Sequence, residues 1–214
     1  MTESYLRNPH GLSLTVVVTR EESRTAFEAR LAPHDNASVA LGRWEDLPPH
    51  GCFATAGNAF GIMNAGIDAV VVKRFGTSVQ QQVQERILDQ YHGEQPIGSA
   101  FLVETGHGDV PYLCHAPTMR VPRGISGTDN VYRAARACFL AVGHHNRVAE
   151  DPIETLVLPA FGAGFGGMPV DEVARQTAVA WQLFDEVPFR PDWDRIIRRE
   201  QLICMDGEER RVTL

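Results

Sequence analysis

Glycines that could bring backbone N–H groups close to an anion gather in the segment after residue 52. An apolar run, 52–56, is followed by glycines at 57, 61 and 66, and then by a second apolar run that continues toward Gly76. That order predicts a strand, a glycine-rich loop and a helix. The first N–H groups of a helix have no partner within it and lie at the positive end of its dipole. Phosphate therefore binds readily at such a junction.

A second junction of the same kind follows later in the chain. The apolar, partly β-branched run 153–159 leads into a glycine-rich segment, 160–169, and a helical pattern continues from 169 to 183. Two strand–loop–helix junctions in one α/β domain predict a cleft that holds an anionic ligand between its two loops.

The length and net charge of the chain limit the number of domains and the kind of ligand. A chain of 214 residues and 23.6 kDa suits one domain, so we expect a single domain over 1–214, with its motifs within about 37–206. The net charge of −7 and the lack of a basic block argue against general nucleic-acid binding. Any phosphate group must therefore be bound locally.

The cysteines and the N-terminus indicate the compartment. The four cysteines lie far apart and form no short paired spacing, so we expect neither a disulfide framework nor a metal site, and we expect no cofactor. Residues 1–11 are polar and lack the apolar core of a signal peptide, and no segment is long and apolar enough to span a bilayer. A cytoplasmic protein with no membrane partner is expected.

The periodicity of apolar residues predicts alternating strands and helices. A hairpin is predicted where Gly106-His107-Gly108-Asp109 separates two strands, and a loop is predicted over 117–129. The fold class that follows is α/β, a three-layer α-β-α sandwich with a central mixed sheet. The expected strands are 12–19, 37–41, 52–56, 99–105, 111–116, 153–159 and 201–205, and the expected helices are 20–31, the run from Ile67 toward Gly76, 78–91, 130–146, 169–184 and 193–200.

The adjacent residues Cys114 and His115 suggest an alternative catalytic site, in which a thiol nucleophile is activated by a histidine base. Adjacent strand residues point to opposite faces of a sheet, so the two side chains cannot easily pair. A buried cysteine is the interpretation that the pattern favours.

Three motifs in order resemble the macrodomain family. Ala56-Gly57-Asn58 with the segment 64–68 is similar to the first ligand loop of that family, and Pro159–Pro169 is similar to the second. Between them, Leu113–Pro117 resembles its apolar-His-Ala-x-Pro strand end. The resemblance covers about 52–180 and implies a cleft for ADP-ribose over a mixed sheet. Some members hydrolyse ADP-ribose from proteins, nucleic acids or O-acetyl esters, or remove its terminal phosphate.

The resemblance also implies roles for individual residues. Asn58 and Asp68 stand where hydrolytic members carry an Asn that binds the distal ribose and an Asp that orients or activates water. An amide suits the first role because it both donates and accepts. The residues that would contact the diphosphate are Asn64, Ala65, Gly66 and Ile67 in the first loop and Gly162, Ala163, Gly164, Phe165 and Gly166 in the second. The implied partners are ADP-ribose or a related nucleotide and ADP-ribosylated macromolecules.

The chain also departs from the family pattern. The Gly-Asp-Ile segment that grips adenine is replaced by Gly42-Arg43-Trp44, where Trp44 either stacks on a base or packs half-buried in the core. Gly162-Ala163 replaces the usual Ser-Thr pair, and Gly166 replaces the aromatic residue that packs on the distal ribose, with Phe165 one place early. Arg120, in a segment without a counterpart, either guards the cleft or pairs with a surface carboxylate.

Two functions of different classes follow. In the first, the protein is a hydrolase of ADP-ribose derivatives, with Asp68 acting on water and Asn58 positioning the sugar. In the second, it is a non-catalytic reader that binds ADP-ribose or a related nucleotide. Asp68 favours the hydrolase, whereas the altered adenine region and second loop favour the reader. In isolation, Asp68 would be read as an acid that compensates the helix dipole.

Overall fold

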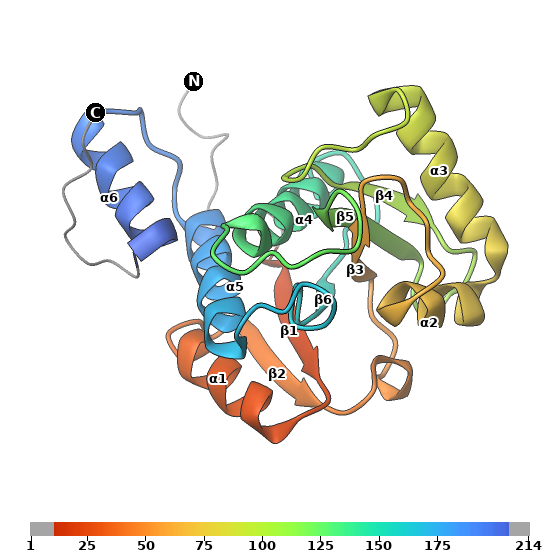
Figure 1. Cartoon of the computed structure of the whole chain (residues 1–214), viewed down its shortest axis with the longest axis horizontal. Coiled ribbons are helices and arrows are strands. Elements are labelled where there is room, and N and C mark those ends of the chain that lie inside the picture. Colours follow the sequence, from red (N-terminus) through yellow and green to blue (C-terminus); the bar gives the residue numbers. More distant parts are fainter. Residues whose placement is uncertain (1–10, 206–214) are drawn as a thin grey trace.

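A computed structural model describes residues 11–205 of the chain (Figure 1). The strands are β1 (Ser13–Val18), β2 (Ala37–Leu41), β3 (Cys52–Asn58), β4 (Phe101–Glu104), β5 (Tyr112–Met119) and β6 (Thr155–Pro159). The helices are α1 (Glu21–Leu31), α2 (Gly66–Phe75), α3 (Thr77–Tyr91), α4 (Asn130–Asn146), α5 (Val170–Asp185) and α6 (Trp193–Met205), with a 3-10 turn, η2, at Trp44–Asp46.

The strands form one six-stranded mixed sheet in the order β2-β1-β6-β3-β5-β4. All neighbours run parallel except β4, which pairs antiparallel with β5 as the predicted hairpin. β3 and β6 are adjacent and parallel at the centre. Their carboxyl ends, and the glycine-rich loops that follow, therefore lie at the same edge of the sheet, where ligands bind in open α/β sheets.

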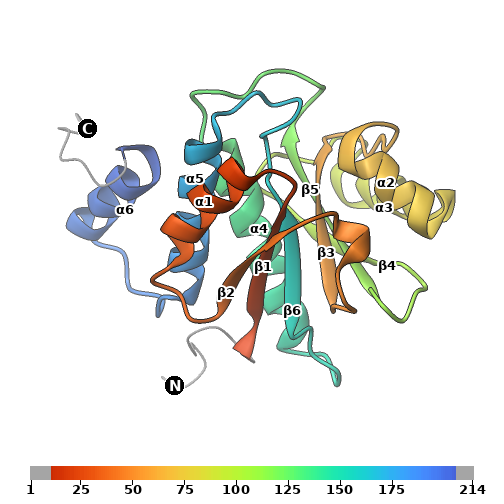
Figure 2. The same ribbon diagram turned by 90° about the horizontal axis from the view of Figure 1, so that it is seen from below.

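Helices cover both faces of the sheet, as the sequence predicts (Figure 2). Successive strand residues point to opposite faces, so Ala54 and Leu156 pack in the core beneath α1, α4 and α5, whereas Phe53 and Val157 pack in the core beneath α2 and α3. The near-continuous apolar sequence of β3 and β6 reflects burial on both faces. The predicted three-layer sandwich is confirmed.

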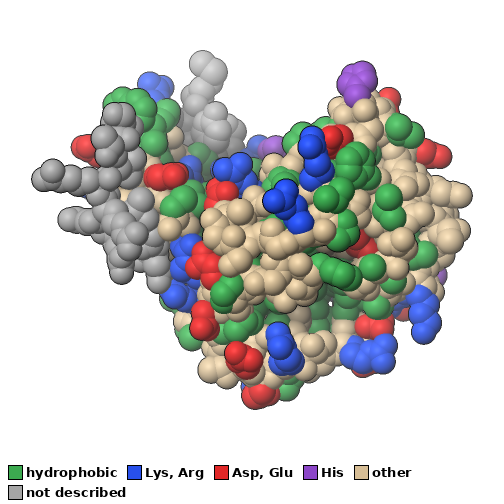
Figure 3. All heavy atoms as spheres, viewed as in Figure 1, with side chains coloured by type: hydrophobic (Ala, Val, Ile, Leu, Met, Phe, Trp, Pro, Cys, Tyr) green, Lys and Arg blue, Asp and Glu red, His purple; other side chains and the backbone are tan. Residues whose placement is uncertain are grey.

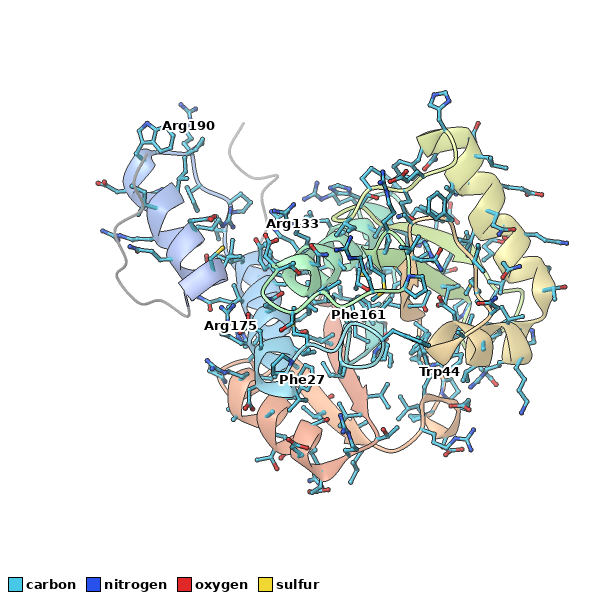
Figure 4. The ribbon with its side chains drawn as sticks, viewed as in Figure 1. Phe27, Trp44, Arg133, Phe161, Arg175 and Arg190 are labelled. Atoms are coloured by element: carbon cyan, nitrogen blue, oxygen red, sulfur yellow. The ribbon has the colours of Figure 1, made fainter. Side chains whose placement is uncertain are left out.

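The C-terminal end of the described chain differs from the sequence prediction. A strand over 201–205 was expected, but α6 continues to Met205 and packs against α5, outside the three layers (Figure 1). The reason is Arg175, a buried side chain of α5 that faces α6 (Figure 4). Its guanidinium donates to the backbone oxygens of Leu202 and Ile203 at 2.9 and 2.8 Å. Carbonyls in the last turn of a helix lack intrahelical partners, so Arg175 stabilises the end of α6.

The predicted loop over 117–129 is also shorter than expected, because β5 continues to Met119. Its register with β3 shifts at Gly57/Asn58, where Gly57 pairs with Pro117 and Asn58 with Met119. No helix among residues 11–205 is long and apolar enough to cross a membrane.

Candidate ligand cleft

A cavity of about 210 Å³ lies between the two glycine-rich loops, at the carboxyl ends of β3, β5 and β6. No Lys or Arg among residues 11–205 lines it. In the space-filling view, charged side chains surround a central area of hydrophobic side chains and backbone (Figure 3). The lining residues are Ala56, Gly57, Asn58, Ile62, Asn64, Ala65, Gly66, Ile67, Asp68, Thr118, Met119, Pro122, Pro159, Ala160, Gly162, Gly164, Phe165 and Gly166.

One wall of the cleft is the N-terminus of α2. No side chain caps this helix, and Ala65, Gly66, Ile67 and Asp68 all line the cavity. The first N–H groups of α2 therefore lack helical acceptors and lie at the positive end of the dipole. This arrangement can bind an anion through backbone groups alone.

The opposite wall is the loop after β6, which is folded around glycines. Gly162 has φ +80°, and a Cβ on Gly166 would lie only 2.5 Å from the carbonyl oxygen of Gly162. The carbonyl of Gly166 accepts the N–H of Ile125 at 2.8 Å, which joins this loop to the segment before α4. Gly166 is therefore required by packing, and Phe165, 66% exposed, is the aromatic side chain that reaches the cleft.

Asn58 ends β3 and organises the first loop. Its Nδ2 donates to the carbonyl of Ile62 at 2.7 Å, while its Oδ1 accepts the N–H groups of Phe60 and Ile62 at 3.1 and 3.3 Å. These bonds occupy both lone pairs of the amide oxygen and leave one N–H for a ligand. Asn58 thus holds the first loop in shape, in addition to the ligand role expected for it.

Asp68, in the first turn of α2, is buried at the base of the cleft. It is 6% exposed, and its Oδ1 accepts a hydrogen bond from the hydroxyl of Thr55 on β3. Burial raises the pKa of this carboxyl to about 6, although the Thr55 hydroxyl opposes the change. A carboxylate that changes its charge near neutral pH can act as a general base, or can be neutral and only structural.

His115, on β5, lies behind the wall of the cleft. Its Nδ1 donates to Gln95 Oε1 at 2.7 Å, because the Gln95 amide nitrogen is turned toward the carbonyl of Ser99. Burial lowers the pKa of His115 to about 4, so the ring is neutral. Its Nε2 lies directly against Gly57, where an added Cβ would come within 2.2 Å of it. His115 and Cys114 face opposite sides of the sheet, which supports the reading of Cys114 as a buried core residue.

Trp44 and Arg120, for which the sequence allowed two roles each, both lie outside the cavity. Trp44, labelled in Figure 4, is 2% exposed. It stacks on Phe53 with ring centroids 4.0 Å apart, and its indole N–H donates to His50. It is a fully buried core residue and cannot stack on a base. Arg120 forms a two-pronged ion pair with Glu94 at 2.6 and 3.1 Å, the surface pairing that was one of its two readings.

The structure brings together all but one of the residues expected to form the site. Ala163 does not line the cavity and packs against the main core instead. Thr118, Met119 and Pro122 also line the cavity but were not expected there. Thr118 and Met119 were assigned to a loop because the strand was expected to end at residue 116, whereas β5 continues to Met119. A polar residue next to the carboxyl end of a central strand was the available signal for Thr118.

The Macro domain family model matches residues 54–177, and the chain belongs to this family. It is 32% identical over 152 residues to an uncharacterized protein of Aeropyrum pernix, covering 71% of this chain and 69% of that one. It is also 34% identical over 112 residues to an uncharacterized protein of Mycobacterium tuberculosis, of which it spans only 27%.

Solved macrodomains share the fold at lower identity. The macrodomain of Mycobacterium tuberculosis DarG superposes with a TM-score of 0.57 at 20% identity, over 69% of this chain and 91% of that one. A mutant of the Oceanobacillus iheyensis macrodomain, solved with ADPR, also gives 0.57, at 14% identity and over 85% and 83% of the two chains. The predicted family membership is confirmed.

Proposed function

We propose that the cleft binds ADP-ribose, or a related nucleotide diphosphate, and that Asp68 promotes hydrolysis of an ADP-ribose derivative. The observation that supports this most strongly is the uncapped N-terminus of α2, which faces the loop 162–166 across a cavity lined by no Lys or Arg of the described chain. Converging backbone N–H groups in a site of this kind favour a diphosphate over a simple apolar ligand. The Oceanobacillus iheyensis relative solved with ADPR supports the same ligand class.

The size of the cavity suggests how the ligand would lie. At about 210 Å³, the cavity is smaller than the roughly 300–1,000 Å³ of typical small-molecule sites. It would hold the diphosphate and the distal ribose, with the adenine beyond it. Asn58 would then donate its remaining N–H to the distal ribose, and Phe165 would pack over the mouth.

The chemistry that we propose for Asp68 is general-base assistance. Its carboxylate is buried in the wall of the cavity, and its second oxygen has no hydrogen-bond partner among the described residues. That oxygen would accept a proton from an attacking water while Thr55 holds the first oxygen in place. The same burial suits a reader in which Asp68 only supports the fold, so the two functions require a direct test.

The test separates binding from turnover. Calorimetry with ADP-ribose, AMP and NAD should show that ADP-ribose binds most tightly. Replacing Asp68 with Ala should reduce turnover of an ADP-ribosylated protein about a hundredfold to ten-thousandfold, while affinity for ADP-ribose barely changes.

Asp171→Ala is the matched control, because Asp171 is also a first-turn acid but lies in α5, outside the cavity. Asp171→Ala should change neither the turnover nor the affinity for ADP-ribose. Tight binding without turnover of any linkage by the wild type would identify a reader, and the absence of ADP-ribose binding would refute the proposed ligand.

A further inference from the structure

The register of the two central strands singles out Thr118. Gly57 pairs with Pro117 and the next residue, Asn58, pairs with Met119, so Thr118 is an extra residue in β5. Such bulges redirect a side chain and are common next to functional sites. Thr118 lies beside Asn58, at the end of the cleft where we place the distal ribose.

Thr118 also holds an unsatisfied polar group. The residue is 0% exposed and lines the cavity, and its Oγ1 has no hydrogen-bond partner among residues 11–205. Only its backbone is bound, through a bond of 2.9 Å from Asn130 Nδ2 to its carbonyl oxygen. Buried hydroxyls are normally paired, so an unpaired one at a cavity wall indicates a missing partner.

The hydrogen bonds of the neighbouring Asn58 indicate what kind of group this missing partner would be. Both lone pairs of its amide oxygen are taken by backbone N–H groups, so Asn58 can donate to a sugar hydroxyl but cannot accept from one. A threonine hydroxyl both donates and accepts. Thr118 would therefore supply an acceptor that Asn58 cannot offer to a sugar hydroxyl beside it.

We propose that Thr118 is a specificity-determining residue whose hydroxyl hydrogen-bonds the distal sugar of the ligand. This inference rests on the proposed function, because it needs an ADP-ribose-like ligand in the cleft. It predicts that Thr118 distinguishes ADP-ribose from ADP, which lacks the distal sugar.

Calorimetry on Thr118→Val tests this, because valine keeps the shape and removes the hydroxyl. The affinity for ADP-ribose should fall about 3- to 10-fold, the effect of losing one hydrogen bond. The affinity for ADP should stay within about twofold, and Thr118→Ser should restore most of the ADP-ribose affinity. The Tm without ligand should be unchanged or higher, since valine leaves no unpaired hydroxyl.

Thr177→Val is the matched control, because Thr177 is also buried but its hydroxyl donates to the Val173 carbonyl at 2.8 Å. It should lower the Tm and leave both affinities unchanged. Equal ADP-ribose affinity in Thr118→Val and the wild type would overturn the inference alone. A parallel loss for ADP, or a fall in Tm like that of Thr177→Val, would overturn it as well. A wild type that binds neither ligand would overturn the proposed function and, with it, this inference.

Discussion

At the scale of single residues, the chemistry of the cleft depends on the pH at which the Asp68 carboxyl group loses its proton. Burial raises its pKa from 3.8 to about 6. If Asp68 works as a base, turnover should rise between about pH 5 and pH 7, with a midpoint near 6, because only the ionised form accepts a proton. A profile of kcat/KM across this range checks the assignment, because kcat/KM reports the pKa of the free enzyme. A flat profile would contradict it.

The same pKa predicts how stability depends on pH. A carboxyl whose pKa is raised by folding binds its proton more tightly in the folded state, so it lowers stability as the pH rises from about 4 to about 6. Asp68→Asn keeps an oxygen that can accept from Thr55 but carries no charge. The variant should match the wild type near pH 3.5 and be more stable at pH 8, by at most about 3 kcal/mol.

Urea unfolding at the two pH values measures this difference. Asp171→Asn is the control, because that residue is exposed, and it should show little difference at either pH. A less stable Asp68→Asn at pH 8 would mean that the negative charge, and not the geometry of the pair with Thr55, holds α2 on β3.

At the scale of elements, β3 and β5 pack closely where Gly57 on β3 meets the ring of His115 on β5. A Cβ there would lie 2.2 Å from His115 Nε2, and the ring cannot easily move because Gln95 holds its other nitrogen. Gly57→Ala should therefore lower the free energy of unfolding by about 1–3 kcal/mol, the usual cost of overpacking. Gly164→Ala, at a cleft glycine whose added Cβ would meet no atom within 4 Å, should change it by less than about 0.5 kcal/mol.

A double-mutant cycle measured by urea unfolding identifies the cause. In a His115→Ala background the cost of Gly57→Ala should shrink, because the ring is gone. An unchanged cost would show that the backbone of β3, and not the imidazole, requires glycine at this position.

The elements also show what the sequence could and could not predict. Strand–loop–helix order placed β3, β6 and both loops correctly, because apolar runs and glycines are local signals. The hydrogen bond from Ile125 to Gly166 and the bulge at Thr118 join segments far apart in the chain, and no local pattern encodes them. Likewise, the apolar residues 202–205 after Gln201 suggest a strand, whereas the hydrogen bonds from Arg175 on α5 to the last turn of α6 favour a helix.

At the scale of the whole molecule, the charge distribution predicts how binding responds to salt. The protein has a net charge of −7, and within the part of the chain that the structure describes no Lys or Arg lines the cavity. Arg120 is held by Glu94, and Arg123 is an exposed residue next to Pro122, which does line the cavity. If backbone N–H groups bind the diphosphate, there is little charge attraction for salt to screen.

The affinity for ADP-ribose should therefore fall less than about threefold between roughly 0.05 and 0.5 M NaCl, measured by calorimetry. Arg123→Ala should leave both the affinity and this salt dependence unchanged. A steep dependence that Arg123→Ala flattens would place that guanidinium on the phosphates. In that case the segment after β5 would close over the ligand and contribute the charge that the two glycine-rich loops lack.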